Sequence, residues 1–499
     1  MLQALITVFS PPILIPWLLA MTLGIFIGAM PGLTATMGVA LIVPLTFHMQ
    51  PIAGLAMILG LSFTAIFAGD IPATFLRVPG TPASGAAVLD GYEMSKQGRG
   101  SLAIMIDLFC STLGGLIGVV LLITVSPTLA KFALKFTHFE YFWLGVLGLS
   151  MSAVITKGSN LKGLISMVAG LLLATIGIDV STGFPRFAFG NINLISGINF
   201  IPVMIGMFGL SEVLKSVATQ THDELAGAAV AEMRKTKIRD VLKIMGRNKR
   251  VILQSSLIGT LIGALPGAGA DIAAWVSYGL AKKTSKKPEL FGTGVAEGVV
   301  APTTANNAAL GGTWIPALVF GIPGDTITAI VLGAMLMYGL KPGPLVFQDN
   351  KELINQIFSV ALVSQVFLLI LGFIGIKAFA YFFKAPRNVV LAGITVFSLI
   401  GAYAIRTNVF DVFLVIIFGV LGYFMEKIEM PLSPLILGIV LGPMIEDNLR
   451  IGLIKTDNSF LPFLTRPISG TFALILLFVF LWEPVKKLFT RKRGGAKRK

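Results

Sequence analysis

Charged residues are scarce in this chain of 499 residues. Asp, Glu, Lys and Arg make up 13% of it, hydrophobic residues make up 55%, and the mean hydropathy is +0.86. A soluble protein of this size needs a charged surface, so this composition excludes a soluble globular protein. Apolar stretches long enough to cross the ~30 Å hydrocarbon core of a bilayer recur along the whole length. The sequence predicts an all-α integral membrane protein with roughly 10 to 14 transmembrane helices, several of them broken by Gly and Pro.

Cysteine and histidine are almost missing. The single cysteine, Cys110, excludes an internal disulfide framework and a cysteine metal site. The histidines at 48, 138 and 222 are scattered and form no H-E-x-x-H cluster, which argues against a protease-like zinc site. There is no G-x-S-x-G motif and no nucleophile with a nearby base. We therefore expect no enzymatic activity and no catalytic cofactor.

The net charge of +15 is concentrated in two segments. Residues 234–250 hold eight Lys or Arg against one Asp, and residues 486–499 hold eight basic residues and no acidic one. Both segments flank apolar spans, which is the positive-inside pattern, and anionic lipid attracts such segments. The charge therefore indicates membrane topology and contact with the bilayer, not a nucleic-acid partner. We divide the chain into a first membrane repeat (1–215), a basic cytoplasmic linker (216–250), a second membrane repeat (251–485) and a basic cytoplasmic tail (486–499).

The chain contains an internal repeat. Residues 24–36 (GIFIGAMPGLTAT) recur as residues 259–271 (GTLIGALPGAGAD), 235 positions later. Residues 71–82 (IPATFLRVPGTP) recur as residues 315–326 (IPALVFGIPGDT), 244 positions later. Two matched blocks in the same order, each with a Pro-Gly pair, predict two structural repeats, and we expect the second to be inverted relative to the first.

The Pro-Gly pairs predict broken helices or re-entrant hairpins. Pro removes a backbone donor and Gly permits a positive φ, so together they interrupt a helix. Freed backbone groups are tolerated at membrane depth only when they are buried in protein or line a wet cavity. Matched breaks in two repeats point to the binding site of a secondary transporter, where half-helix N-termini face an anionic substrate. The predicted substrate contacts at the breaks are Pro31, Gly32, Pro79, Gly80, Pro266, Gly267, Pro323 and Gly324.

The alternative interpretation of these glycines is close packing of helices, as in GxxxG motifs. The pairs with that spacing are Gly24/Gly28 and Gly259/Gly263. Packing explains these four, but it gives no reason for the prolines.

Small polar side chains follow the breaks. Hydroxyl, amide and carbonyl oxygens are hard ligands that suit an alkali cation or a carboxylate substrate. The further predicted substrate contacts are Thr34, Thr36, Thr81, Asn306 and Asn307. The candidate Na⁺ ligands are Thr36, Ser84, Asp271, Thr304, Asn306, Asp325 and Thr326. For the two asparagines the alternative is a loop at the membrane surface.

Charged residues at the breaks differ between the halves. Arg77 aligns with Gly321, and we predict that its guanidinium grips a substrate carboxylate; the alternative is an anchor at the membrane interface. Asp271 and Asp325 occur only in the second half, where the first half has threonines. They could bind Na⁺, carry a proton or cap a half-helix.

At residues 28–47 and 263–283 the chain resembles the large membrane subunit, TctA, of the tripartite tricarboxylate transporters. Residues 71–82, the following 91–100 (GYEMSKQGRG) and 301–312 (APTTANNAALGG) also match the pattern of that family. The resemblance covers essentially the whole chain.

The resemblance implies a multi-pass secondary transporter of the bacterial inner membrane. It would import citrate or another di- or tricarboxylate, driven by a gradient of Na⁺ or H⁺. The implied partners are a small four-helix membrane subunit (TctB-like) and a periplasmic solute-binding protein (TctC-like). The implied mechanism is elevator-like, with a transport domain moving against a scaffold. A channel is the alternative, but it needs a continuous polar path, whereas paired breaks favour an occluded site. A membrane scaffold would leave the polar groups at the breaks unexplained.

Overall fold

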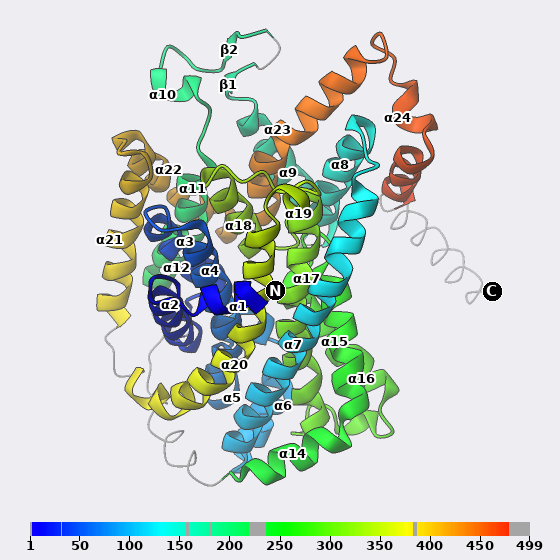
Figure 1. Ribbon diagram of the computed structural model, residues 1–499. Coiled ribbons are helices and arrows are strands. Elements are labelled where there is room, and N and C mark those ends of the chain that lie inside the picture. The colour runs from blue at the N-terminus through cyan, green and yellow to red at the C-terminus, as the bar shows by residue number, and fades with distance from the viewer. Residues whose placement is uncertain are drawn as a thin grey trace, which may run out of the picture.

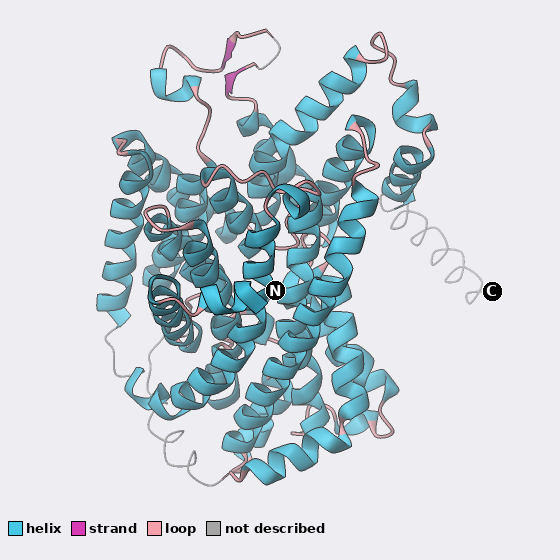
Figure 2. Ribbon diagram, in the orientation of Figure 1, coloured by secondary structure: helices cyan, strands magenta, loops and turns pink. Residues whose placement is uncertain are grey.

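The computed structural model is almost entirely helical, as Figures 1 and 2 show. It describes residues 2–30, 32–155, 159–179, 182–218, 236–382 and 387–478. Within these ranges the only strands are β1 (Gly177–Ile178) and β2 (Pro185–Arg186), a short antiparallel pair. The predicted all-α fold is therefore confirmed. Residues 219–235 of the predicted linker and the predicted tail 486–499 lie outside the described residues.

The first part of the chain forms helices up to residue 218. They are α1 (Leu2–Val8), α2 (Pro11–Ala29), α3 (Ala35–Thr46), α4 (Pro51–Ala68), α5 (Asp70–Leu76), η1 (Pro82–Ser84), α6 (Val88–Lys96), α7 (Gly100–Ala133), α8 (His138–Ile155), α9 (Asn160–Ala174), α10 (Ile192–Ile195), α11 (Phe200–Met204), the π-helical η2 (Ile205–Leu210) and α12 (Ser211–Ala218).

The second part begins at residue 236. Its helices are α14 (Ile238–Arg247), α15 (Lys249–Gly263), α16 (Gly269–Thr284), η3 (Pro288–Leu290), α17 (Ala296–Phe320), α18 (Thr326–Met337), α19 (Val346–Asp349), α20 (Lys351–Phe382), α21 (Arg387–Arg406), α22 (Val409–Lys427), α23 (Ser433–Ile454) and α24 (Leu461–Thr465). A last apolar helix covers Pro467–Phe478.

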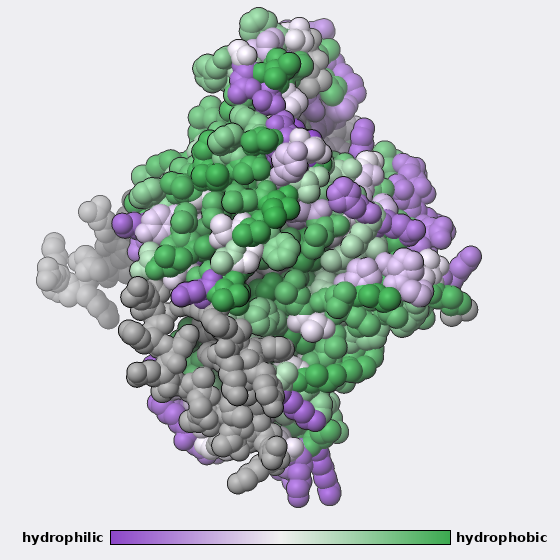
Figure 3. Space-filling view, turned by 90° about the vertical axis from the view of Figure 1, so that its left-hand side faces the viewer, coloured by the Kyte–Doolittle hydropathy of each residue, from purple (hydrophilic) through white to green (hydrophobic). Residues whose placement is uncertain are grey.

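Seven helices in the described ranges are long and apolar enough to cross a membrane: Pro11–Ala29, Pro51–Leu76, Gly100–Ala133, Phe200–Ala218, Lys351–Ala378, Asn388–Arg406 and Val409–Lys427. The shorter apolar helices are Ala35–Thr46, Asn160–Ala174, Thr326–Met337 and Pro467–Phe478. Of these, α3 and α18 each begin shortly after a Pro-Gly break. A broad apolar surface covers the middle of the molecule in Figure 3, and hydrophilic residues gather mainly towards its ends. The chain is therefore a multi-pass membrane protein.

Two helices at the centre of the fold are surrounded by protein. The most apolar stretch of Pro51–Leu76, a range that combines α4 and α5, is fully buried. In α17, every residue from 298 to 319 is buried. The closest helix packing joins α17 to α7 and α15, and α4 to α2. Because these helices contact protein and not lipid, they can carry polar side chains inside the membrane.

The packing of α2 on α4 has a counterpart in α15 on α17. A Cβ atom on Gly28 would lie 2.2 Å from the carbonyl oxygen of Ala65, and one on Gly263 would lie 2.2 Å from that of Ala309. The glycines one turn earlier make the same kind of contact. Gly28 and Gly263 are 235 positions apart, and their partners Ala65 and Ala309 are 244 positions apart. These are the two offsets of the sequence repeat, so the contacts agree with the predicted duplication. They also assign close packing, and not substrate contact, to the four glycines with GxxxG spacing.

Candidate functional site

The backbone at the breaks follows the repeat. After the first break of each half, Gly32 and Gly267 adopt positive φ values of 85° and 80°. At the second break, Arg77 ends α5 with a φ of 61°, and the aligned Gly321 ends α17 with a φ of 68°. Arg77 therefore holds a left-handed conformation that favours glycine. Pro31 lies outside the described residues.

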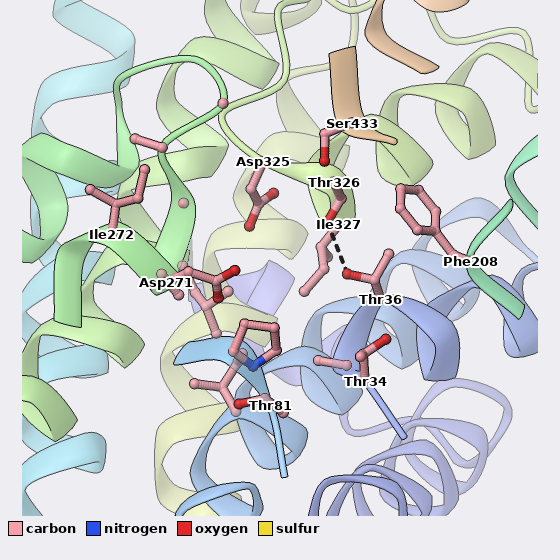
Figure 4. Close-up of a pocket in the computed structure, with 18 of the residues that line it drawn as sticks. Thr34, Thr36, Thr81, Phe208, Asp271, Ile272, Asp325, Thr326, Ile327 and Ser433 are labelled. Carbon is pink, nitrogen blue, oxygen red and sulfur yellow. Dashed lines mark hydrogen bonds between the residues drawn. The ribbon is translucent and has the colours of Figure 1, made fainter. Parts of the chain in front are cut away.

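A cavity of about 410 Å³ lies where the four breaks meet (Figure 4). Each break contributes to its wall. The contributing residues are Thr34, Ala35 and Thr36 from the first, Thr81 and Pro82 from the second, Gly267, Ala268, Gly269, Ala270, Asp271 and Ile272 from the third, and Asp325, Thr326 and Ile327 from the fourth. Other lining residues come from η2, α12, α22 and α23: Met207, Phe208, Ser211, Glu212, Glu426, Ser433 and Leu437.

The helices α3, α16 and α18, which follow three of the breaks, begin at the cavity. Thr34 caps α3, since its Oγ1 accepts a hydrogen bond from the Met37 N–H at 3.1 Å. Asp325 caps α18, since its Oδ1 accepts from the Thr328 N–H at 2.8 Å, and the Thr328 hydroxyl accepts from the Asp325 N–H at 3.0 Å. The first turns of helices carry unpaired N–H groups and the positive end of the helix dipole. The cavity therefore offers a favourable environment for an anion.

One hydrogen bond at the wall of the cavity joins the first half of the chain to the second. The hydroxyl oxygens of Thr36 in α3 and Thr326 in α18 lie 2.9 Å apart, as the dashed line in Figure 4 marks. This bond joins the first turns of two helices that are 290 residues apart in the chain.

Carboxylates also line the cavity. Glu212 and Glu426 both pair with Lys215, at 3.5 and 3.1 Å. Asp271 lies in the first turn of α16 and Asp325 caps α18. In the view of Figure 4 these two aspartates lie to one side of the cavity, and Thr34 and Thr36 to the other. No Lys, Arg or His is among the described lining residues. The side with Asp271 and Asp325 suits a cation, whereas the first turn of α3 offers a hydroxyl and contains no carboxylate of its own.

Several predicted contact residues shape the breaks without lining the cavity. A Cβ atom on Gly80 would lie 2.2 Å from the Gly28 carbonyl oxygen, and one on Gly324 would lie 2.6 Å from that of Gly263. Close backbone approach, and not a ligand, explains glycine at these positions. The other members of the Pro-Gly pairs absent from the lining are Gly32, Pro79, Pro266 and Pro323.

Arg77 does not reach the cavity. Its side chain is exposed, and the guanidinium carbon lies 5.6 Å from the centre of the Tyr92 ring. The structure gives no support to the predicted grip on a substrate carboxylate. Its exposed position agrees better with the alternative, an anchor at the interface.

The two asparagines are in the interior of α17, so the surface-loop alternative for them is wrong. Both side chains are fully buried. The amide nitrogen of Asn306 donates to Asp70 Oδ2 at 3.2 Å, and that of Asn307 donates to Asn306 Oδ1 at 3.1 Å. Neither side chain lines the cavity, so the structure gives no support to the predicted direct contact with substrate. Both side chains belong instead to a buried chain of hydrogen bonds.

Ser84 and Thr304, two candidate Na⁺ ligands, do not line the cavity, and their hydroxyls have protein partners. Ser84 Oγ lies 2.9 Å from Thr81 Oγ1, and Thr304 Oγ1 donates to the Val300 carbonyl at 2.6 Å. Both polar atoms of Asn306 are engaged as well. The candidate cation ligands that line the cavity are Thr36, Asp271, Asp325 and Thr326.

The sequence analysis missed two buried carboxyl groups, Asp70 and Asp107. Each is 1% exposed, and each interrupts an apolar segment. A carboxyl inside a membrane span is costly, and that signal alone would have made both residues functional candidates.

Comparison with known proteins agrees with this architecture. Residues 14–437 match the tripartite tricarboxylate transporter TctA family, and that range includes all four breaks. An Agrobacterium vitis protein described as "Uncharacterized 52.8 kDa protein in TAR-I ttuC' 3'region" is 35% identical over 461 residues, which cover 92% of this chain and 91% of that protein. A second Agrobacterium vitis protein, "Uncharacterized protein in TAR-II ttuC' 3'region", is 37% identical over 213 residues, which cover 43% of this chain and 88% of that protein. No solved structure matches. The chain therefore belongs to the tripartite tricarboxylate transporter TctA family, a family of transporters and not of enzymes.

Proposed function

We propose that this chain is the large permease subunit of a transporter that imports a di- or tricarboxylate such as citrate across the bacterial inner membrane, coupled to a gradient of Na⁺ or H⁺. The observation that carries this proposal is the convergence of four helix breaks on one cavity that Thr, Ser, Asp and Glu side chains help to line. Matched broken helices are the architecture by which secondary transporters hold small charged solutes at mid-membrane. The cavity of about 410 Å³ is in the size range of small-molecule sites.

The substrate carboxylate would bind at the N-terminus of α3. Thr34 and Thr36 provide hydroxyls there, and the helix end provides N–H groups. The matched helices α16 and α18 carry Asp271 and Asp325 in or next to their first turns, so their positive ends are already partly neutralised.

The coupling cation would bind beside Asp271 and Asp325. An anionic substrate in the same cavity is repelled by two aspartates, and a cation between them reduces that repulsion. The substrate and the cation then each raise the affinity of the protein for the other, and this coupling of binding is what symport needs.

The cavity is lined by two groups of segments, the breaks and the helices η2, α12, α22 and α23. We propose that the helices with the breaks move against the second group, so that the cavity opens to each side in turn. The Thr36–Thr326 bond would keep the moving helices together.

The partners would be a small four-helix membrane subunit and a periplasmic solute-binding protein. Figure 1 shows the basic helix α14 and the β1–β2 hairpin at opposite ends of the molecule. If the basic end faces the cytoplasm, the hairpin end faces the periplasm, where a solute-binding protein delivers its substrate.

The test is uptake of labelled citrate into proteoliposomes that contain all three subunits, with and without gradients of Na⁺ and of pH. We expect saturable uptake that needs one of the two gradients. Asp271→Asn should weaken the dependence on the coupling ion, and the exposed Asp349→Asn is the matched control. Uptake indifferent to both gradients would exclude symport, and flux that does not saturate would favour the channel.

A further inference from the structure

Asp70 and Asp107 form a buried carboxyl pair next to the cavity. Asp70 begins α5 and Asp107 lies in α7, and each side chain is 1% exposed. The two carboxyl groups lie within hydrogen-bonding range of each other. They are therefore two acids in contact inside the membrane protein.

Each carboxyl group has one oxygen with a partner and one without. Asp70 Oδ2 accepts from Asn306 Nδ2 at 3.2 Å, and Asp107 Oδ1 accepts from Ser111 Oγ at 2.8 Å. Asp70 Oδ1 and Asp107 Oδ2 are buried and have no partner among the described residues. Buried polar atoms without partners are rare and indicate an unseen ligand or a function.

Within the part of the chain that the structure describes, no basic side chain forms an ion pair with Asp70 or Asp107. The buried Asp411, in contrast, accepts a hydrogen bond from Arg406 Nε at 2.9 Å. Two ionised carboxylates in contact repel each other strongly when water and cations are excluded. One proton between them removes one charge and lets one carboxyl group donate a hydrogen bond to the other.

The surroundings add one more titratable group. The Cys110 thiol of α7 faces Asp107 and is bonded to Thr304, and a neutral thiol cannot balance a carboxylate. Asp90 of α6 and Glu297 of α17 are bonded to Tyr278 and Ser285 instead. Glu93 of α6 pairs with Lys96, and the charged residues described on α14, α15 and α20 have exposed side chains.

We propose that the Asp70–Asp107 pair is a proton-binding site that takes up and releases the coupling proton of the transport cycle. This role rests on the proposed function. It names the proton as the coupling ion and places it at the Asp70–Asp107 pair, in place of a cation beside Asp271 and Asp325. Neither residue lines the cavity, so protonation and substrate binding occur at neighbouring sites.

A chain of hydroxyl groups connects the pair to the cavity. Thr81 lines the cavity, and its Oγ1 lies 2.9 Å from Ser84 Oγ. The Ser84 side chain in turn interacts with the carboxyl group of Asp70. Because hydroxyls both donate and accept, this chain can pass a proton from the cavity to Asp70 and Asp107.

The first experiment detects the proton without any transport. Infrared spectra of the purified protein at neutral pH should contain the C=O band of a protonated, buried carboxyl group. Asp70→Asn and Asp107→Asn should each remove that band, and the exposed Asp240→Asn should keep it. Size-exclusion chromatography identifies variants that do not fold. A wild-type band that survives in folded Asp70→Asn and Asp107→Asn, or no band in the wild type, overturns the proposal whatever the protein transports.

The second experiment tests coupling in proteoliposomes. Asp107→Asn resembles the permanently protonated state, so we expect loss of citrate accumulation under a pH gradient and retention of citrate exchange without a gradient. Retained accumulation in this variant overturns the coupling role. A band that disappears when Na⁺ is added would show that Na⁺ displaces the proton, and it would also overturn the assignment. The band present in a protein that moves no carboxylate would leave the proton site standing and reject the proposed function.

Discussion

The hydroxyl oxygens of Thr36 and Thr326 lie 2.9 Å apart and connect the two halves of the chain at the wall of the cavity. The bond links the first turn of α3, where no carboxylate is present, to the first turn of α18, which Asp325 caps. It therefore couples the side of the cavity proposed for the substrate to the side proposed for the cation.

Replacing Thr326 by Val should loosen this connection. The variant leaves the Thr36 hydroxyl without its partner, and we expect a loss of about 1 kcal/mol in the free energy of unfolding. Citrate uptake should fall at the same time, because both helices bear proposed ligands. The matched control is Thr124→Val, an exposed threonine whose hydroxyl bonds only to its own helix. Equal uptake by the two variants would contradict a role of the bond in transport.

Gly263 should not tolerate a side chain. A Cβ atom there would lie 2.2 Å from the Ala309 carbonyl oxygen, so Gly263→Ala must push α15 away from α17. We expect a large drop in the yield of folded protein and in the melting temperature.

The control for that change is Gly279→Ala in α16, where no atom lies within 4 Å of the added Cβ. Alanine is favoured over glycine in a helix by about 1 kcal/mol, so this variant should be neutral or more stable. The same loss of folded protein in both variants would contradict the packing role of Gly263.

Asp90 should hold the loop after α16 in place. Its buried carboxylate accepts hydrogen bonds from the Gly294 N–H at 2.8 Å, the Val295 N–H at 2.9 Å and the Tyr278 hydroxyl at 2.9 Å. Asp90→Asn removes the charge that strengthens these bonds, and we expect a loss of about 2 kcal/mol in stability. Hydrogen exchange of the amides of residues 292–295 should accelerate. Unchanged exchange there would show that the carboxylate is not needed.

The β1–β2 hairpin should loosen in acid. The hydrogen bond from Arg186 and the charges of Arg186 and Arg450 hold the pKa of Glu446 below its ordinary value of 4.5. The pair therefore contributes stability above pH 4.5, and this contribution is lost as the pH falls through the lowered pKa. Hydrogen exchange in residues 177–179 and 182–187, compared with the intrinsic rate at each pH, should accelerate in the wild type below pH 4.5. Glu446→Gln should lack this step, and an identical step in the variant would assign it to another group.

The fold class was predictable because membrane solubility is a property of composition. A chain with 13% charged residues must bury its surface in lipid, and lipid allows backbone groups to be satisfied only within helices or closed barrels. The breaks were predictable for a local reason. Pro and Gly act on the adjacent turn, so helices end at Ala29, Gly263 and Phe320, next to the motifs.

The contacts around the breaks were not predictable from the motifs. Asn306 and Asn307 follow small residues typical of a hairpin, yet they lie in the interior of α17 because α7, α15 and α16 enclose that helix. Arg77 has the charge for a carboxylate, yet the left-handed end of α5 directs it to the surface. In both cases the deciding factor is the packing of distant segments.

The sequence by itself therefore determined a helical membrane protein with matched breaks in two halves, since hydropathy and Pro-Gly chemistry act over one or a few turns. Only the tertiary structure decided that four breaks enclose one cavity and that Asp70 meets Asp107 across two helices. The reason is physical: the protonation of a carboxyl group and the affinity of a cavity depend on neighbours in space, and those neighbours come from segments that the chain order does not place together.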